Sequence, residues 1–398
     1  MRVIMIHQHD PTADHIGGIG TFINTFVKYA PANFEIDLVG VTRDPARYPV
    51  GRWYEMNIEG RACRFLPLVA GNTTRRGRIP LSLRFTWALR RHRSLIDFQK
   101  AVLGFHRIEP SLVLRGLSNP KVLVLHAHVQ DLYNTQSEVT WAKFPWLYLW
   151  FERYLIPAMR RVYIVREDAV SFYRSRYPNL ADRFSFLPTW VDDTVFSSMR
   201  DTERSSWRQR LGQEQGFDPS SRLLLFVGRF EGQKNPMLLL ESFRQLREKS
   251  THVILVLIGT GTLEGAIRAF IRDKGLTKAV RMVGLRPQEE VARWMNVADC
   301  LCLSSAFEGM PLVVLEALQC GLPVVSTDVG ETKRLLQSPD VGRLVKEQTP
   351  EAFRRAIEDL LKQFPDREAC KRQVAPYTAR RILEPVYRYY LEVAEAKQ

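Results

Sequence analysis

The sequence predicts an α/β protein of two domains, each built on a parallel sheet with helices on both sides. Short apolar runs alternate with longer amphipathic segments, a pattern typical of β-α-β units. The 398 residues are enough for two full hydrophobic cores. With 45% hydrophobic and 25% charged residues, the composition excludes disordered and collagen-like classes.

The first half of the chain begins with a strand, a loop and a helix. The apolar run Val3–Ile6 precedes a loop that reaches Gly20, and apolar residues then recur at helical spacing. Further strands are expected at Ile36–Val41, Val122–His126, Val162–Val165 and Phe184–Leu187. Residues 42–120 show no clear period.

In the second half, strands and helices alternate more regularly. Strands are expected at Leu223–Val227, Val253–Ile258, Val280–Val283, Cys300–Leu303 and Val324–Ser326. Helices are expected after Asn235, Thr262, Pro287, Pro311 and Pro350. This order implies parallel strands joined by right-handed crossovers.

The cysteines are few and irregularly spaced. The five are Cys63, Cys300, Cys302, Cys320 and Cys370. No apolar leader with a cleavage site precedes the first strand, so we expect the reducing cytoplasm. Cys300 and Cys302 alternate along an apolar run, and we interpret them as core residues in preference to metal ligands.

The net charge of +14 is unevenly distributed. Residues 61–107 contain eleven lysines and arginines and one acid, Asp97, with leucines and aromatic residues between them. Such a segment could present a basic face to anionic lipid or to a phosphorylated acceptor, or it could be a solvated helix face. Nucleic acid is disfavoured because no nucleic-acid-binding motif accompanies the charge.

The most apolar run, Phe144–Met159, is interrupted by Glu152 and Arg153, so no transmembrane span is expected. We interpret its aromatic residues as helix core, with an interfacial belt as the alternative. These residues are Trp141, Trp146, Tyr148, Trp150 and Tyr154.

Residues 307–318, F-E-G-M-P-L-V-V-L-E-A-L, predict a diphosphate site. Pro311 suits the first position of a helix, and Gly309 allows a tight turn into it. Amide groups at such a helix start hold phosphate well. Glu308 could accept hydrogen bonds from sugar hydroxyls, and Glu316, more than a turn inside, could reach a ribose diol. The alternative is a surface loop with one glutamate in solvent and the other in an exposed helix turn.

This E-x7-E spacing, followed by G-L-P-V-V-S-T-D-V-G (321–330), resembles glycosyltransferase family 4. The segments F-V-G-R-F-E-G-Q-K-N-P (226–236) and M-I-H-Q-H-D-P…G-G-I-G-T (5–21) are also similar to that family, the former to its phosphate-binding segment. The resemblance spans nearly the whole chain, and its second half is the more specific. It implies the type B glycosyltransferase fold, an α/β fold of two Rossmann-like domains that face each other across a cleft.

The resemblance also implies the domain division. An acceptor-binding domain is expected at residues 1–190, a nucleotide-sugar-binding domain at 191–376, and a helix at 377–398 that crosses back to the first domain. The hinge is expected near Pro188–Phe196. Three tyrosines of the last helix would need burial, namely Tyr387, Tyr389 and Tyr390.

Arg229 and Lys234 follow the strand Leu223–Val227, where they could receive the charge that develops on the leaving diphosphate. The glycines of G-G-I-G, before a helix start at Thr21, could let backbone amides approach a substrate. The expected substrate contacts are Gly18, Gly20, Gly309, Met310, Pro311, Leu312, Glu316 and, beside the base, Leu285. No Asp-x-Asp occurs, so neither a metal nor another cofactor is expected.

Histidines end the strand in V-L-V-L-H-A-H-V-Q-D (122–131). Similar enzymes use a histidine in this place to bond the donor sugar near its reacting carbon. His128 is the first choice and His126 the rival, with Asp131 to orient whichever acts. The alternative for each is a satisfied core histidine.

The resemblance implies a retaining, metal-independent glycosyltransferase. It would move a hexosyl unit from a nucleotide diphosphate sugar, with a UDP-sugar favoured over GDP-mannose. The acceptor would be a hydroxyl of a glycan precursor or lipid-linked acceptor in cell-envelope or exopolysaccharide biosynthesis. We expect the protein in the cytoplasm, at the inner face of the membrane if residues 61–107 meet lipid.

Two alternatives on the same fold are a catalytically silent nucleotide-sugar-binding scaffold and a membrane-surface protein. The first is suggested by departures from the family pattern, at P-T-W-V-D (188–192) and V-G-E-T-K-R (329–334). These departures put in doubt the donor contacts around Gly330 and Glu331.

Overall fold

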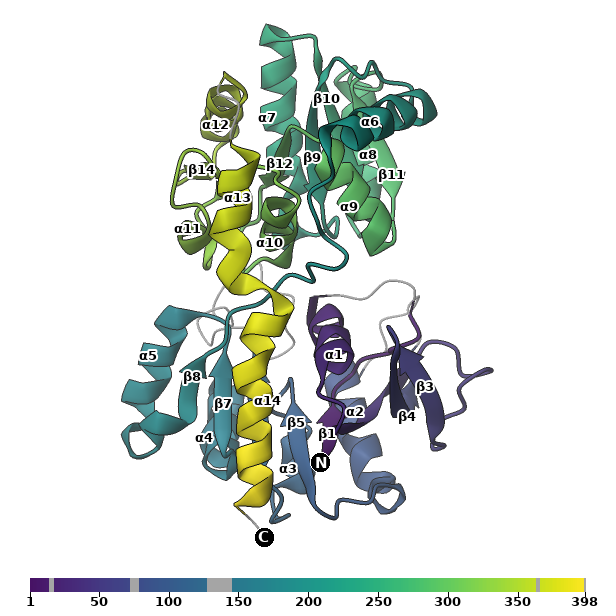
Figure 1. Ribbon diagram of the computed structural model, residues 1–398, viewed down its shortest axis with the longest axis vertical. Helices are drawn as coiled ribbons and strands as arrows, with labels where there is room; N and C mark the ends of the chain where they lie inside the picture. Colours follow the sequence, from purple (N-terminus) through teal and green to yellow (C-terminus); the bar gives the residue numbers. More distant parts are fainter. Residues whose placement is uncertain (14–17, 72–78, 127–144, 363–365, 397–398) are drawn as a thin grey trace. The chain divides into compact units, whose positions relative to one another are not determined.

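The computed structural model describes residues 1–13, 18–71, 79–126, 145–362 and 366–396. The chain forms two compact units (Figure 1). Unit 1 contains Met1–Pro188 and Ala379–Gln398, and unit 2 contains Thr189–Thr378. The divisions predicted at 190/191 and 376/377 lie close to these boundaries.

The described residues of unit 1 form an eight-stranded sheet. In spatial order the strands are β3 (Tyr54–Ile58), β4 (Arg61–Ala70), β2 (Glu35–Thr42), β1 (Arg2–Ile6), β5 (Ala101–Phe105), β6 (Lys121–Leu125), β7 (Arg161–Ile164) and β8 (Phe184–Phe186). All neighbours are parallel except β3, which runs antiparallel to β4. The sheet is therefore doubly wound around β1, with an antiparallel strand at one edge.

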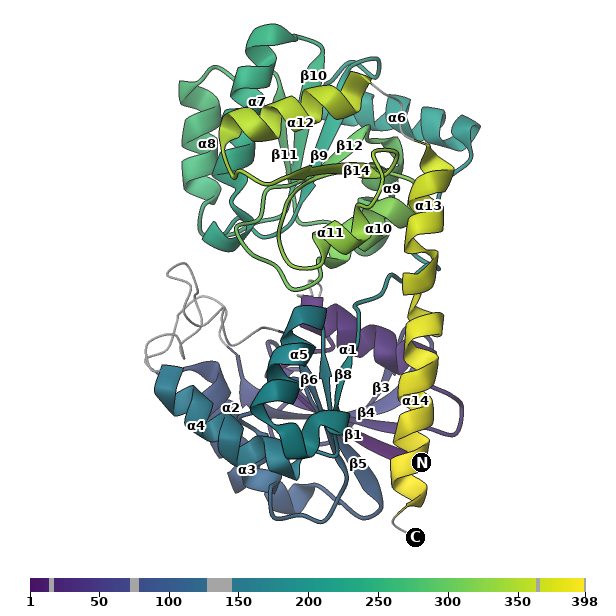
Figure 2. The same ribbon diagram turned by 90° about the vertical axis from the view of Figure 1, so that its left-hand side faces the viewer.

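Helices cover both faces of this sheet. They are α1 (Gly18–Tyr29), α2 (Leu81–Arg91), α3 (Ser111–Leu114), α4 (Pro145–Leu155), α5 (Glu167–Arg176) and α14 (Ala379–Glu395). Four of them, α2 to α5, share one apolar cluster with one face of the sheet. The other face carries α1 and α14, so α14 lies across the sheet from α2, α3 and α4 (Figure 2).

The last helix, α14, docks on unit 1 through aromatic side chains. Tyr387 Oη donates to the carbonyl oxygen of Phe26 at 2.7 Å, and the two rings lie 4.8 Å apart. Tyr390 is buried above Gly104, where a Cβ atom would lie 2.5 Å from Met5 Sδ and 3.2 Å from Tyr390 Oη. Glycine in β5 therefore allows the helix to approach the sheet closely.

The six-stranded sheet of unit 2 is parallel throughout its described residues. In spatial order its strands are β11 (Val280–Gly284), β10 (Val253–Ile258), β9 (Arg222–Val227), β12 (Cys300–Leu303), β13 (Val324–Thr327) and β14 (Gly342–Val345). Its helices are α6 (Asp201–Gln215), α7 (Pro236–Lys249), α8 (Glu264–Asp273), α9 (Gln288–Val297), α10 (Leu312–Gln319), α11 (Thr332–Leu335), α12 (Pro350–Lys362) and α13 (Arg367–Val374).

Both faces of the unit 2 sheet are buried, which explains why its strands are continuous apolar runs. Leu223 and Leu225 of β9 pack with α9, α10 and α13, and Leu224 of the same strand packs with α7, α8 and α12. Cys300 and Cys302 point into the second cluster, and both are free thiols. They are core residues, as the alternation predicted.

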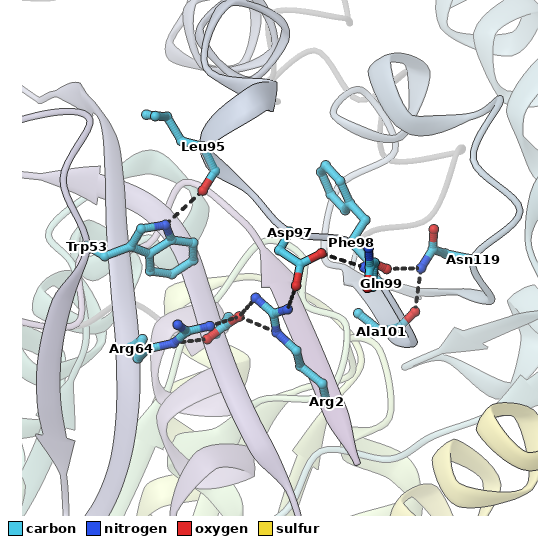
Figure 3. A network of polar contacts seen from close by, with 10 residues as sticks. Arg2, Trp53, Arg64, Leu95, Asp97, Phe98, Gln99, Ala101 and Asn119 are labelled. Carbon is cyan, nitrogen blue, oxygen red and sulfur yellow. Dashed lines mark hydrogen bonds and ion pairs between the residues drawn. The ribbon is translucent and has the colours of Figure 1, made fainter.

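Residues 42–120, which showed no clear period, contain β3, β4, α2 and β5. Strand β3 is half exposed and alternates polar with apolar residues at the sheet edge. Strand β4 contains Pro67, beside a register shift in its pairing with β2. Arg64 of β4 is held by Asp37, which also binds Arg2, and Arg2 reaches Asp97 (Figure 3). Part of the basic segment 61–107 is therefore structural, because it stabilises the amino-terminal edge of the sheet.

The predicted hinge segment, Pro188–Phe196, begins with the last residue before the boundary and otherwise belongs to unit 2. The bulky Trp190 is buried there, and Val191 N donates to Tyr377 O at 2.9 Å. Val191 also forms a parallel bridge with Thr378. Trp190 therefore fills a packed site next to Val191, whose partners Tyr377 and Thr378 lie where the chain passes back from unit 2 to unit 1.

No helix in the described ranges has both the length and the apolar content needed to cross a bilayer.

Replacing Tyr387 by phenylalanine removes a buried hydrogen bond and leaves the Phe26 carbonyl without its partner. We expect Tyr387→Phe to lower the free energy of unfolding by about 1 to 2 kcal/mol, measured by urea denaturation. The matched control is Tyr389→Phe, because Tyr389 Oη donates to Arg160 O at an exposed site. Equal losses in the two variants would contradict the docking role of Tyr387.

Candidate functional site

The order of strands in unit 2 locates a binding site at the carboxyl edge of its sheet. The chain winds outward from β9 to β10 and β11, and then outward on the other side from β12 to β13 and β14. Loops after the two central strands therefore diverge, and ligands of doubly wound sheets bind in the crevice between such loops. The loops after β9 and β12 flank this position.

An ion pair joins these two loops. Lys234, after β9, lies with its Nζ atom 2.5 Å from Oε1 of Glu308, after β12. Ser305 Oγ donates to the same oxygen at 2.7 Å. The two charged side chains are only 18% and 8% exposed. Glu308 and Lys234, predicted separately as sugar and phosphate contacts, are thus direct neighbours.

Each member of the pair keeps hydrogen-bonding capacity. Among the described residues, no group donates to Oε2 of Glu308, because both of its contacts use Oε1. An ammonium group has three protons, so Lys234 Nζ retains donors beyond the one given to Glu308. The pair can therefore accept from one ligand group and donate to another while it stays intact.

The loop of Lys234 is fixed by the neighbouring loops. Gln233 O accepts from Ala306 N at 2.8 Å, and Ser304 Oγ donates to Lys234 O at 3.1 Å. On the other side, Phe230 N donates to Thr260 O at 2.9 Å. A 3-10 turn (Gly232–Lys234) then leads into α7, which begins with Pro236.

Arg229, the second predicted cation, is on the same loop but exposed. Its Nη2 atom donates to Gln233 Oε1 at 3.1 Å, and Gln233 Nε2 donates to Phe307 O at 3.3 Å. Gln233 therefore connects Arg229 to the loop that precedes Glu308.

The start of α10 differs by one residue from the prediction. Pro311, expected as its first residue, is the capping residue, with extended backbone angles, and Leu312 begins the helix. The reason is that the tight turn continues through Pro311, so its ψ angle of 113° is not helical. Within the described chain no side chain caps this helix start, so its first amides face the loop. Met310 is buried, and its carbonyl oxygen accepts from Thr189 Oγ1 at 3.2 Å.

Glu316 lies in the second turn of α10 and is half-buried. Burial raises the pKa of its carboxyl group to about 7, and the charge of Lys234 opposes that shift. Its carboxylate has no hydrogen-bond partner in the part of the chain that the structure describes. A desolvated acceptor without a donor is suited to a ligand with two hydroxyl groups.

Gly330 and Glu331, whose role the sequence left in doubt, support the Glu308 loop through their backbone. Glu331 N donates to Gly309 O at 2.9 Å. Gly330 has φ of +52°, and a Cβ atom there would lie 1.9 Å from Gly309 O. The two loops touch so closely that only glycine fits.

Leu285 follows β11 at the edge of the sheet and is exposed. Its neighbour Gly284 accepts at its carbonyl oxygen from Gly259 N at 3.0 Å. The loops after β10 and β11 are therefore joined beside Leu285, and its contact with a base stays a prediction.

In unit 1, two site glycines were placed wrongly. Gly18 and Gly20 were predicted in a loop before a helix at Thr21, but α1 begins at Gly18 and Gly20 is buried within it. Glycine costs little at this place, because the first-turn amides have no intrahelical acceptor to lose. Gly17 lies outside the described residues.

His126 directly follows β6, and His128 lies outside the described residues. His126 Nε2 is 2.9 Å from His106 Nδ1, and the two rings are stacked. Burial, with Arg107 nearby, lowers the pKa of His126 to about 3, so the ring is neutral at pH 7.

Sequence reasoning missed three further histidines beside it. His106 follows β5, and His7 and His9 follow β1, so all lie at carboxyl ends of strands next to the point where the strand order reverses. Burial lowers the pKa of each. His7 Nδ1 and His106 Nε2 are buried without a partner among the described residues. A signal was available for two of them, since His7 and His106 each directly follow an apolar run, whereas His9 follows Gln8.

Within the described ranges, no group of three or more His, Cys, Asp or Glu side chains is arranged to hold a metal ion.

The fold is that of the type B glycosyltransferases. Over 99% of both chains, the structure is similar to sucrose-phosphate synthase from Thermosynechococcus elongatus, with a TM-score of 0.80 and 20% identity. It is also similar to WaaG, described as a glycosyltransferase of lipopolysaccharide biosynthesis (TM-score 0.69, 17% identity, 99% of both chains). A third similar structure is Anabaena Alr3699/HepE in complex with UDP-glucose (TM-score 0.69, 15% identity, 100% of this chain and 99% of the other).

The family-model match lies within unit 2. Residues 208–375 match the family model of glycosyl transferases group 1. The D-inositol 3-phosphate glycosyltransferase of Paenarthrobacter aurescens (strain TC1) is 32% identical over 207 residues, 51% of this chain and 49% of that protein. The amylovoran biosynthesis glycosyltransferase AmsK of Erwinia amylovora is 32% identical over 136 residues, 33% of each chain. The chain thus matches about half the length, or less, of these curated relatives.

We expect Gly330→Ala to destabilise the protein by more than about 1 kcal/mol, because the new methyl group cannot avoid the Gly309 carbonyl and φ is positive. Thermal unfolding measures the change. The control is Gly265→Ala in α8, where a Cβ atom meets nothing within 4 Å. It should leave stability unchanged or raise it by up to about 1 kcal/mol.

The raised pKa of Glu316 predicts a pH dependence of stability. Between the ordinary value of 4.5 and about 7, the folded state holds a proton that the unfolded chain has released. The contribution of the Glu316 carboxyl group to the free energy of unfolding is therefore present below pH 4.5 and is lost as the pH rises to about 7.

Glu316→Gln should abolish this loss. As the pH rises from about 5 to about 8, the free energy of unfolding of the variant should increase by about 1 to 3 kcal/mol relative to that of the parent. Urea denaturation at the two pH values measures the gain. Glu351→Gln on the exposed surface of α12 is the control, and a parallel response of both variants would contradict the assignment.

Proposed function

We propose that the protein is a retaining, metal-independent glycosyltransferase that moves a hexosyl unit from a nucleotide diphosphate sugar to a hydroxyl of a glycan precursor or lipid-linked acceptor. A UDP-sugar is the favoured donor and GDP-mannose the alternative. The acceptor would belong to cell-envelope or exopolysaccharide biosynthesis. The observation that carries the proposal is the Lys234–Glu308 pair beside the uncapped start of α10, where the strand order reverses.

The leaving group is best received on the cationic side of this pair. Breaking the bond from sugar C1 to the diphosphate oxygen places negative charge on that oxygen. The remaining protons of Lys234 Nζ, the first amides of α10 and the Arg229 guanidinium can all donate to it. Their charge stabilises the departing diphosphate without a metal ion.

The sugar and the ribose fit the two carboxylates. Glu308 Oε2 is the acceptor available to a sugar hydroxyl, because Oε1 is already occupied. The ribose diol can donate both hydroxyls to Glu316. Because such hydrogen bonds favour the ionised carboxylate, donor binding should lower the raised pKa of Glu316.

The transfer step needs no separate base in this proposal. The acceptor oxygen bonds to C1 on the face from which the diphosphate departs, and the acceptor proton passes to a diphosphate oxygen. His126 or His128 is assigned the contact with the donor sugar. A neutral ring at His126 suits a hydrogen bond to a hydroxyl group.

The relatives support the donor and acceptor classes. HepE was solved in complex with UDP-glucose, and the names of the sequence relatives describe glycosyl transfer to an inositol phosphate and within amylovoran biosynthesis. The sequence departure at residues 329–334 gives less support to the silent-scaffold alternative, because Gly330 and Glu331 have a packing role beside Gly309.

Release of nucleoside diphosphate from a panel of nucleotide sugars, with and without added acceptors, tests the proposal. We expect Lys234→Ala and Glu308→Gln each to lower turnover roughly 100- to 1,000-fold, since each removes a charge at the reacting centre. The control is Lys249→Ala, an exposed lysine at the other end of α7, which should retain the parent rate.

Parent-like turnover in both site variants would refute the site. Donor binding without turnover, over every acceptor tried, would instead support a silent scaffold.

A further inference from the structure

Three helices of unit 1 form one layer on one face of its sheet. Helices α2, α3 and α4 all contribute to the apolar cluster on that face (Figure 2). Helix α2 contacts α3. Arg115, at the end of α3, donates from Nε to Tyr154 O of α4 at 3.3 Å. Side chains that point away from the sheet on these helices therefore share one outer surface.

Large apolar side chains are exposed on this surface. Helix α4 presents Trp146, Trp150 and Tyr154, spaced four residues apart, with 67%, 57% and 43% of each residue exposed. Helix α2 presents Trp87, 64% exposed, and the whole set forms what we call the aromatic face. Its members are Leu83, Trp87, Leu112, Trp146, Trp150 and Tyr154.

For Trp146, Trp150 and Tyr154, this exposure corrects the interpretation as helix core. The face of α4 that packs on unit 1 carries Glu152 and Leu155 instead. Glu152 accepts hydrogen bonds from Tyr173 and Tyr177. Because the buried positions were already filled, the tryptophans remain outside. Tyr148 is half-buried and packs against the apolar cluster, as the core interpretation expected, and Trp141 lies outside the described residues.

Exposed arginines accompany the aromatic residues. The guanidinium of Arg115 lies 4.2 Å from the ring centre of Tyr154, and that of Arg91 lies 5.8 Å from that of Trp87. The exposed cations of the layer are Arg84, Arg90, Arg91, Arg115 and Arg153.

Acidic side chains do not accompany these arginines on the outer side of the described helices. In the described helices α2, α3 and α4, the only acid is Glu152, which is fully buried. Asp97, the one acid of the basic segment, is bound by Arg2 in the network at the amino edge of the sheet (Figure 3). The aromatic face is therefore flanked by unopposed positive charge.

A pocket of about 410 Å³ adjoins α4. Its lining includes Arg153, from the exposed side of α4, and Arg176, which also pairs with Glu152 at 3.5 Å. The pocket is also lined by Leu180 and by Tyr177, so its two guanidinium groups suit a phosphate group that is attached to an apolar chain.

We propose that the aromatic face rests on the surface of an anionic lipid bilayer. Tryptophan and tyrosine occupy the headgroup level of membranes, and arginines bind anionic headgroups. The aliphatic Leu83 and Leu112 favour acyl chains over nucleobases as the partner. The inference does not rest on the proposed enzymatic activity, because it uses only helices of unit 1.

Flotation of the full chain with vesicles tests the proposal. Vesicles of equal parts phosphatidylcholine and phosphatidylglycerol should bind the protein, and vesicles of phosphatidylcholine alone should bind it at least roughly tenfold more weakly. Raising the salt from roughly 0.1 M to 1 M should release it, because the Debye length falls to about 3 Å.

Two variants separate the apolar and the charged parts. Trp146→Ala with Trp150→Ala, and Arg90→Gln with Arg91→Gln, should each weaken binding to anionic vesicles by roughly tenfold or more. The control is Arg268→Gln with Arg272→Gln in α8, which makes the same change in net charge on exposed residues of unit 2. The affinity of this control for anionic vesicles should lie within about twofold of that of the parent, because the net charge changes while the aromatic face and its arginines stay intact.

Circular dichroism of all variants establishes that they fold. Binding that is unchanged in both face variants, or equally reduced in the α8 control, overturns the proposal. So does a concentration-dependent dimer that the tryptophan variant abolishes, because the face would then bind a second copy of the chain. Binding of a single-stranded oligonucleotide in competition with vesicles would likewise reassign the face to nucleic acid.

Discussion

The ion pair between Lys234 and Glu308 is the contact on which the functional region of unit 2 depends. It joins the two halves of a doubly wound sheet at the place where their loops diverge, between β9 and β12. Both charges are largely removed from water, so each needs the other, and losing one leaves an uncompensated charge. The serine at 305, the glutamine at 233 and the glycine at 330 all serve to hold these two loops in register.

The arrangement explains how a charged pair can be both structural and chemically useful. Glu308 accepts hydrogen bonds from the protein with Oε1 only, so Oε2 can accept from a ligand. Lys234 has three N–H protons and donates one of them to Glu308, so the others can bind a ligand. A site of this kind is formed before its ligand arrives, so little ordering is required on binding. The cluster of neutral histidines in unit 1 contrasts with it, because burial has removed charge there altogether.

Much of unit 2 could be predicted from the sequence, because a parallel sheet buried on both faces requires continuous apolar strands separated by helices. All five strands expected there are present, and β14 was overlooked because its Gly342 and Arg343 break the apolar run. The half-exposed β3, and β4 with its arginines and proline, lack such a signature. The motif around Glu308 identified the loop. It gave no sign that Lys234 touches it, since that contact joins residues 74 positions apart.

The aromatic residues of α4 illustrate a different limit. Periodicity defines which side chains share a helix face, but it does not say which face is inside. Here a single buried glutamate with two tyrosine partners takes the inner position, and this polar network cannot be recognised without knowing that α5 packs beside α4. The tryptophans are exposed as a result.

The docking of α14 also bears on how the chain is made. The helix that completes one face of the first sheet leaves the ribosome only after all of Thr189–Thr378. At ordinary translation speeds that interval lasts roughly 10 to 40 s. During that interval, the surface around Gly104 and Phe26 lacks the cover that α14 provides, so nascent chains should engage chaperones there until α14 emerges.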